Sequence, residues 1–313
     1  MSMETLQELI RLKKSPVILG LNPTPDLVPP CVLDTGLARY GRTLRGAAEA
    51  LRLYGLGLLE TLADRIPAVL FTPSYYLSFG SAGIAAMEAL IADAKQRGLY
   101  VIVDARCAGD SDEAAVSAGT WLGSCALPDG SVLLPWDCDA LTVSGYGGTE
   151  TISPYTALCA KAGKAVFLVA HTHTGSAREV QDLITGTRMV HTAIADLAVR
   201  LTEREGLLEA CDWSSLGLVA GMNRSGELAT LRSQYPNLFL LIPEYGVNGC
   251  RSRDVQQAMD AFGHGAAVCL SHQVLSAWKA GAVEDPRGTA YKKAAVDSVT
   301  RICRELTKNA PIL

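Results

Sequence analysis

The stretch Leu-Tyr-Val-Ile-Val-Asp-Ala-Arg-Cys-Ala-Gly-Asp, residues 99–110, joins an apolar run directly to a charged one. Its β-branched run, 101–103, is typical of a parallel strand buried on both faces. Asp104 and Arg106 follow at the carboxyl end of that strand, where parallel α/β folds place their chemistry. The alternative to a chemical role is that Asp104 and Arg106 form an ion pair that only stabilises a loop.

The same pattern recurs along the whole chain, because short apolar runs alternate with stretches of helical spacing. We predict strands at residues 16–21, 68–71, 100–103, 140–143, 165–170, 216–220, 238–242 and 266–270. We predict helical regions at residues 36–63, 80–97, 112–121, 151–162, 178–205 with a break near 185–186, 226–234, 255–262 and 290–307. Eight strand–helix pairs predict a fold of the α/β class, a (β/α)8 TIM barrel that forms a single domain over residues 1–313.

Composition and charge narrow the class of protein. The chain is 49% hydrophobic and 19% charged, which supplies a large core and argues against disorder. A net charge of −4 without a basic stripe argues against a nucleic-acid partner. No apolar run reaches membrane-spanning length, and the Met-Ser-Met-Glu start lacks the features of a signal peptide. We therefore expect a cytoplasmic protein with no membrane partner.

Polar residues follow most of the predicted strands, and the barrel rule places them at one mouth. They are Asn22, Thr72, Asp104, Arg106, Ser144, Tyr146, His171, His173, Asn223, Glu244, Tyr245 and His272. Single residues of these types often cap helices. Two carboxylates, an arginine and three histidines at one rim instead predict a site for a small molecule.

A metal site is the less favoured use of these residues. The nine cysteines are scattered without a C-x-x-C pair, so they fit a reducing compartment and give no zinc signature. His171-x-His173 with Asp104 and Glu244 offers suitable ligands. However, we expect only one of these two histidines to face the mouth. If His171 lines the mouth, His173 packs behind it, and we expect neither a metal nor a cofactor.

Several strand ends resemble the bacterial type-2 orotidine 5′-phosphate decarboxylase family. The resemblance is carried by Gly-Leu-Asn-Pro-Thr-Pro-Asp-Leu at 20–27, Asp-Ala-Arg-Cys-Ala-Gly-Asp at 104–110, Asp-Ala-Leu-Thr-Val-Ser-Gly-Tyr-Gly-Gly at 139–148 and Pro-Glu-Tyr-Gly-Val-Asn-Gly at 243–249. It covers roughly residues 15 to 305. The resemblance implies a homodimeric TIM barrel that decarboxylates with a Lys–Asp–Lys–Asp network, whose last Asp comes from the partner subunit.

The chain departs from that family at the positions that carry the chemistry. Asp104 matches the network, but Arg106 stands at its second lysine, and a guanidinium is a poor proton donor. The first lysine falls at Thr72 or Leu70, and the last Asp is Asp110 only after a one-residue shift. The catalytic lysines are therefore expected to be missing.

The positions that anchor the substrate have changed as well. Asn22 aligns with an Asp of the family, and Glu244 aligns with a glycine of the phosphate loop. His272 aligns with an arginine that holds the phosphate. A carboxylate in place of glycine and the loss of a permanent cation should cost several kcal/mol of phosphate binding.

These departures favour an enzyme diverged to lyase or isomerase chemistry through a carbanion. Its substrate would be small, non-phosphorylated and of heterocyclic type, in keeping with secondary metabolism. We assign catalytic roles to Asp104, Arg106, Asp110, His171 and His272, and substrate contacts to Asn22, Thr72, Ser144, Tyr146, Asn223, Glu244 and Tyr245. His171 or His272 would move the proton, since histidine titrates near neutral pH. A non-catalytic binding or scaffold relative, and a genuine decarboxylase of orotidylate to UMP with an atypical site, are the alternatives.

Overall fold

Eight parallel strands close into a barrel in the computed structural model, which describes residues 2–222, 224, 226–243, 245–246, 250–280, 289–308 and 312. The strands, in barrel order, are β1 (Val17–Gly20), β12 (Ala266–Leu270), β11 (Leu240–Ile242), β10 (Leu216–Ala220), β7 (Ala165–His171), β6 (Ala140–Ser144), β3 (Tyr100–Cys107) and β2 (Ala68–Phe71). The predicted TIM-barrel fold is therefore confirmed.

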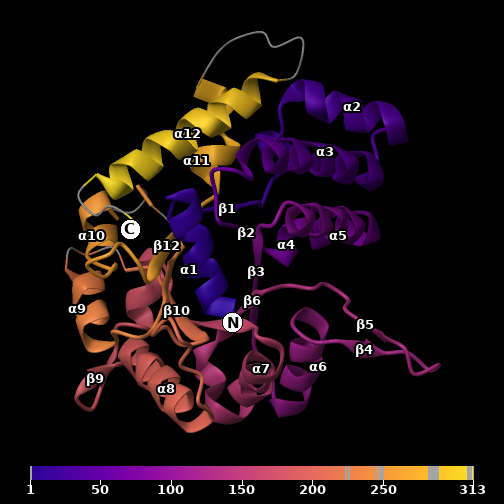
Figure 1. Cartoon of the computed structure of the whole chain (residues 1–313). Helices are drawn as coiled ribbons and strands as arrows, with labels where there is room; N and C mark the ends of the chain where they lie inside the picture. The colour runs from indigo at the N-terminus through magenta and orange to yellow at the C-terminus, as the bar shows by residue number, and fades with distance from the viewer. Residues whose placement is uncertain are drawn as a thin grey trace.

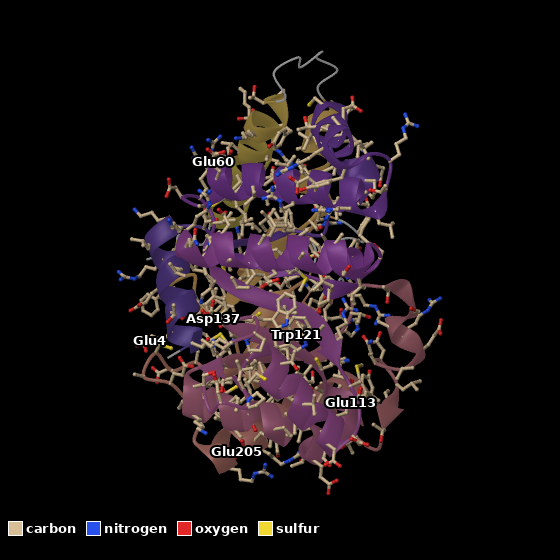
Figure 2. The ribbon with its side chains drawn as sticks, turned by 90° about the vertical axis from the view of Figure 1, so that its right-hand side faces the viewer. Glu4, Glu60, Glu113, Trp121, Asp137 and Glu205 are labelled. Atoms are coloured by element: carbon tan, nitrogen blue, oxygen red, sulfur yellow. The ribbon has the colours of Figure 1, made fainter. Side chains whose placement is uncertain are left out.

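Helices surround the barrel, as Figure 1 shows. They are α1 (Ser2–Lys13), α2 (Pro30–Tyr40), α3 (Leu44–Leu62), α4 (Pro73–Leu77), α5 (Gly80–Gln96), α6 (Ser111–Trp121), α7 (Gly148–Ala162), α8 (Val190–Glu205), α9 (Glu227–Gln234), α10 (Ser252–Gln256), α11 (His272–Leu275) and α12 (Ala290–Thr307). Their outer surface carries charged side chains such as the exposed Glu60 and Glu113 (Figure 2). In the described residues, we find no helix with both the length and the apolarity needed to cross a bilayer.

Two apolar clusters separate the inside of the barrel from its outside. Alternate strand residues such as Phe167 and Val169 fill the interior, whereas Leu168 and Ala170 pack outward against the helical layer. Helix α1 covers the amino-terminal end of the barrel, since its apolar face joins the interior cluster. The carboxyl ends of the strands are thus the open end.

The structure corrects the predicted elements in several places, and the helix predicted at 255–262 begins and ends earlier, as α10. The helical region at 36–63 is two helices, because the chain turns at Gly41 (φ 71°) and the Thr43 side chain then caps α3. The segment before α8 is not helical: it forms a hairpin of β8 (Ile184–Thr185) and β9 (Arg188–Met189) around Gly186. A second hairpin, β4 (Cys125–Ala126) with β5 (Val132–Leu133), and helix α1 were not predicted.

Candidate functional site

A cavity of about 420 Å³ opens at the carboxyl ends of the strands. Five of the predicted site residues line it: Asn22, Thr72, Asp104, Arg106 and His272. It is also lined by His173, which was expected behind His171, and by polar residues that were not predicted, namely Thr24, Asp26, Tyr75, Thr142 and Ser271. The barrel rule therefore located the cavity, although it did not identify all of the side chains.

Asp104 is the most firmly held charge in this cavity. The Thr142 hydroxyl donates to its Oδ1 at 2.7 Å, and Arg106 donates from Nε and Nη2 to its two oxygens at 3.2 Å each. The Asp104 side chain is 14% exposed, whereas that of Arg106 is 51% exposed. A substrate can thus reach the guanidinium, while the carboxylate stays oriented behind it.

An irregularity in β3 produces this arrangement. Val103 pairs with Leu141 and Cys107 with Val143, so β3 has two more residues than β6 between the paired positions. Arg106 has a φ of 47°, which is uncommon for a residue with a side chain, and its backbone N donates to Thr142 Oγ1 at 3.0 Å. Thr142 was missed in the sequence because it lies within an apolar strand.

Two further contacts tie the rim of the cavity together. Asn22 Oδ1 accepts a hydrogen bond from Thr72 N at 2.7 Å, which joins the ends of β1 and β2. Asp26 lies 3.4 Å from Lys279 Nζ and accepts a 2.5 Å bond from Thr24, which lowers the pKa of Asp26. No lysine lines the cavity within the part of the chain that the structure describes.

The expectation that His171 lines the mouth and His173 packs behind it is wrong. The register between β7 and β10 shifts after Val169, which pairs with Val219, so that Ala220 pairs with His171. This shift reverses the alternation, so His171 is buried outside the cavity. His173 lies two residues beyond the end of β7 and lines the cavity. His171 Nε2 lies 3.0 Å from Asp182 Oδ1.

Four other predicted residues do not line the cavity. Asp110 instead caps α6, where it accepts from the backbone N of Asp112 and of Glu113. Ser144 accepts from Tyr146 N at 3.4 Å in a short turn, and Tyr146 is half exposed beside it.

Tyr245 is the fourth, and its hydroxyl donates to Glu305 Oε2 at 2.9 Å on α12. Burial, with this bond as a second cause, raises the pKa of Tyr245 to about 12. The ring is buried away from the cavity, so its predicted stacking on a substrate is not seen. Asn223 and Glu244 lie outside the described residues.

Comparison with known proteins connects this barrel to one enzyme family, although no protein-family model matches the chain. A Rhodopirellula baltica protein named orotidine 5′-phosphate decarboxylase is 30% identical over 261 residues, which is 83% of each chain. A Deinococcus radiodurans protein of the same name is 31% identical over 245 residues, 78% of this chain and 82% of its own. An orotidine-monophosphate-decarboxylase structure from Toxoplasma gondii superposes with a TM-score of 0.73 over 98% of both chains, at 19% identity.

Proposed function

Because the chain belongs to the orotidine 5′-phosphate decarboxylase family, we propose that it is a decarboxylase whose active site is the cavity at the carboxyl ends of the strands. Orotidine 5′-phosphate is the proposed substrate, since relatives at 30% and 31% identity carry that name. The observation that carries the proposal is the Asp104 carboxylate, held by Thr142 and Arg106 within the cavity. This revises the expectation of a non-phosphorylated substrate.

The charges of the cavity suit the loss of carbon dioxide. An oriented Asp104 destabilises a neighbouring substrate carboxylate, and the Arg106 guanidinium stabilises the carbanion left when the carbon–carbon bond breaks. The carbanion then takes a proton. Arginine holds its proton too tightly to supply it, so we assign the donation to His173, which lines the same cavity.

The location of the protein, its oligomeric state and the role of Asp110 form part of the same proposal. We propose a cytoplasmic homodimer that serves pyrimidine synthesis. Asp110 is exposed at the start of α6 and does not line the cavity of its own chain, so it would act in the cavity of a second copy. Light scattering of the purified protein measures whether two copies associate.

The decisive experiment mixes purified protein with orotidine 5′-phosphate and measures UMP by chromatography. We expect UMP from the wild type, none from Asp104→Asn, and faster formation by Arg106→Lys, which supplies an ammonium group that can donate a proton. Asp104→Asn keeps the shape of the side chain and removes its charge, so it is the matched control. No UMP from either the wild type or Arg106→Lys would contradict the proposal.

A second candidate is favoured by the basic side chains of the cavity. Among the described lining residues the basic side chains are Arg106, His173 and His272, without a lysine. This set suits an enzyme of the same barrel that acts on a small molecule without a phosphate. Thermal-shift measurements compare UMP with uridine: stabilisation by UMP alone supports the decarboxylase, whereas equal stabilisation by uridine supports the second candidate.

A further inference from the structure

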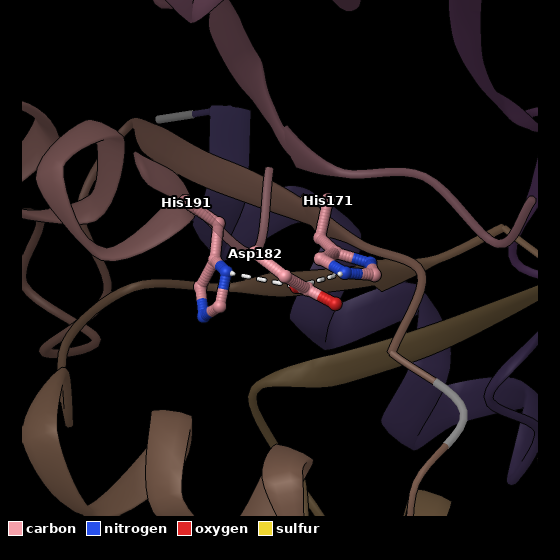
Figure 3. A group of neighbouring side chains, drawn as sticks. All are labelled: His171, Asp182 and His191. Atoms are coloured by element: carbon pink, nitrogen blue, oxygen red, sulfur yellow. Dashed lines mark hydrogen bonds and ion pairs between the residues drawn. The ribbon is translucent and has the colours of Figure 1, made fainter. Parts of the chain in front are cut away.

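We propose that His171, Asp182 and His191 bind one divalent transition-metal ion, with zinc as the preferred ion. The three side chains come from the end of β7, the loop before β8 and the first turn of α8. Figure 3 shows the Asp182 carboxylate between the two imidazole rings. The proposed site lies behind the barrel wall and does not depend on the decarboxylase proposal.

The separations within this His–Asp–His cluster suit a tetrahedral ion. Asp182 Oδ1 lies 3.0 Å from His171 Nε2 and 3.6 Å from His191 Nδ1. One ligand atom from each residue can be chosen so that all three lie within 4.8 Å of one another. A tetrahedral zinc ion with bonds of about 2.0 Å spaces its ligand atoms about 3.3 Å apart. Two of the separations are thus close to what zinc requires.

The chemistry of the donors points to the same class of ion. Two imidazoles and one carboxylate form a ligand set that suits zinc and its neighbours and leaves a fourth position for water. Both histidines are more than nine-tenths buried, at 6% and 7% exposed. His171 turns Nε2 towards the cluster, at 3.0 Å from Asp182 Oδ1, whereas its Nδ1 is buried without a hydrogen-bond partner among the described residues and does not bind the proposed ion.

Two neighbouring features bear on how an ion would enter. A cavity of about 850 Å³ is lined by His191, Met222 and Glu227, so one of the three proposed ligands borders an open cavity. Arg224 Nη2 lies 3.9 Å from Asp182 Oδ2 and competes with a cation for that carboxylate. The Arg224 side chain is 64% exposed and lies 3.7 Å from Glu227, so it can keep this second partner when an ion binds.

The competing structure is a hydrogen-bonded cluster without a metal. His171 already lies at hydrogen-bond distance from Asp182, and His191 Nδ1 lies 3.0 Å from the Gln181 carbonyl oxygen. Both structures would fasten the loop before β8 to the barrel. Only the metal site predicts the binding of one ion per chain and a melting temperature that rises when the ion is added.

The test titrates Co²⁺ into reduced, chelator-treated protein and then displaces it with Zn²⁺. We expect one Co²⁺ per chain, with visible absorption of a tetrahedral nitrogen–oxygen site and without the intense near-ultraviolet band of cobalt–thiolate bonds. His171→Asn and His191→Asn should each weaken Zn²⁺ binding more than about 100-fold, beyond the cost of losing an outer-shell contact. His173→Asn is the matched control, because His173 lies two residues from His171 and faces the other cavity.

Asp182→Asn provides a second variant that keeps the shape and an acceptor oxygen, and circular dichroism checks that each variant is folded. Zinc should raise the melting temperature of the wild type and of His173→Asn, but not that of the other variants. The proposal is overturned if the wild type binds less than one ion per chain, if the absorption is that of thiolate ligands, or if His171→Asn and His191→Asn bind as tightly as the wild type.

Discussion

The Thr142 hydroxyl donates to Asp104 Oδ1 at 2.7 Å and accepts from the backbone N of Arg106 at 3.0 Å. One side chain of β6 therefore orients the carboxylate and also fixes the irregular backbone that presents the guanidinium. Thr142 is 1% exposed, so water does not replace these bonds when the hydroxyl is removed.

We predict that Thr142→Val lowers turnover of orotidine 5′-phosphate by about 10- to 100-fold, because Asp104 loses its orientation. KM should change less than kcat, since the variant disturbs the reacting charges rather than the size of the cavity. The unpaired Arg106 N should also cost about 1–3 kcal/mol of unfolding free energy, measured with urea. Thr142→Ser restores the hydroxyl and should recover both quantities; an equally impaired Ser variant would contradict this role.

The two histidines of the cavity should differ in their effect on catalysis. His173→Asn should lower kcat by about 100-fold or more, the usual contribution of a general acid. His272 is exposed on the rim, with Nδ1 3.3 Å from Ser276 Oγ, so His272→Asn should cost less than about 10-fold. Steady-state kinetics measures both, with His264→Asn as a control away from the cavity. A larger loss for His272→Asn would assign the proton to that residue.

Glu49 should make the stability of the protein depend on pH. Its carboxylate accepts from Arg52 at 2.8 Å and from Arg39 at 3.0 Å, and the Arg52 bond is the main cause that lowers the pKa of Glu49. Its stabilisation is therefore complete above the unfolded-state value, about 4.3, and is lost as the pH falls through the lower folded-state value.

Glu49→Gln should reduce the unfolding free energy by about 1 kcal/mol at pH 7, because the arginines are partly exposed. The difference from the wild type should shrink below pH about 4. Urea unfolding at pH 7 and at pH 3 measures both, and a difference that grows in acid would contradict the pairing.

The apolar runs of the sequence were sufficient to predict the barrel, because buried parallel strands carry an obvious composition. They were also sufficient for Asp104, Arg106 and Asn22, which closely follow apolar runs in the sequence. The orientation of His171 was not predictable in this way. It depends on a register shift between β7 and β10, which involves two segments about fifty residues apart.

Asp110 and Asp182 show two other limits of the sequence. An aspartate before a helix has the same sequence pattern whether it caps the helix or reaches a substrate, and the structure shows a cap. Asp182 lies in a segment whose apolar spacing predicted helix, so its contact with His171 was invisible. What was missed was therefore the partner of each side chain, which the residue type alone does not specify.

Gly221 provides a direct test of the register shift that separates His171 from His173. Its backbone N donates to the His171 carbonyl oxygen at 2.7 Å, and a Cβ at this position would lie 2.5 Å from the carbonyl carbon of Thr172. Gly221→Ala should therefore push the end of β7 away from β10, at a cost of about 1–3 kcal/mol.

The matched control is Gly119→Ala in α6, where a Cβ would meet no atom within 4 Å. Alanine is the better helix former, so this variant should be stabilised by up to about 1 kcal/mol. Urea unfolding compares the two, and turnover of orotidine 5′-phosphate should fall in Gly221→Ala alone, because His173 moves with the strand end. Equal stability of the two variants would mean that the end of β7 tolerates a side chain at position 221. The close approach of β7 and β10 would then not determine the different directions of His171 and His173.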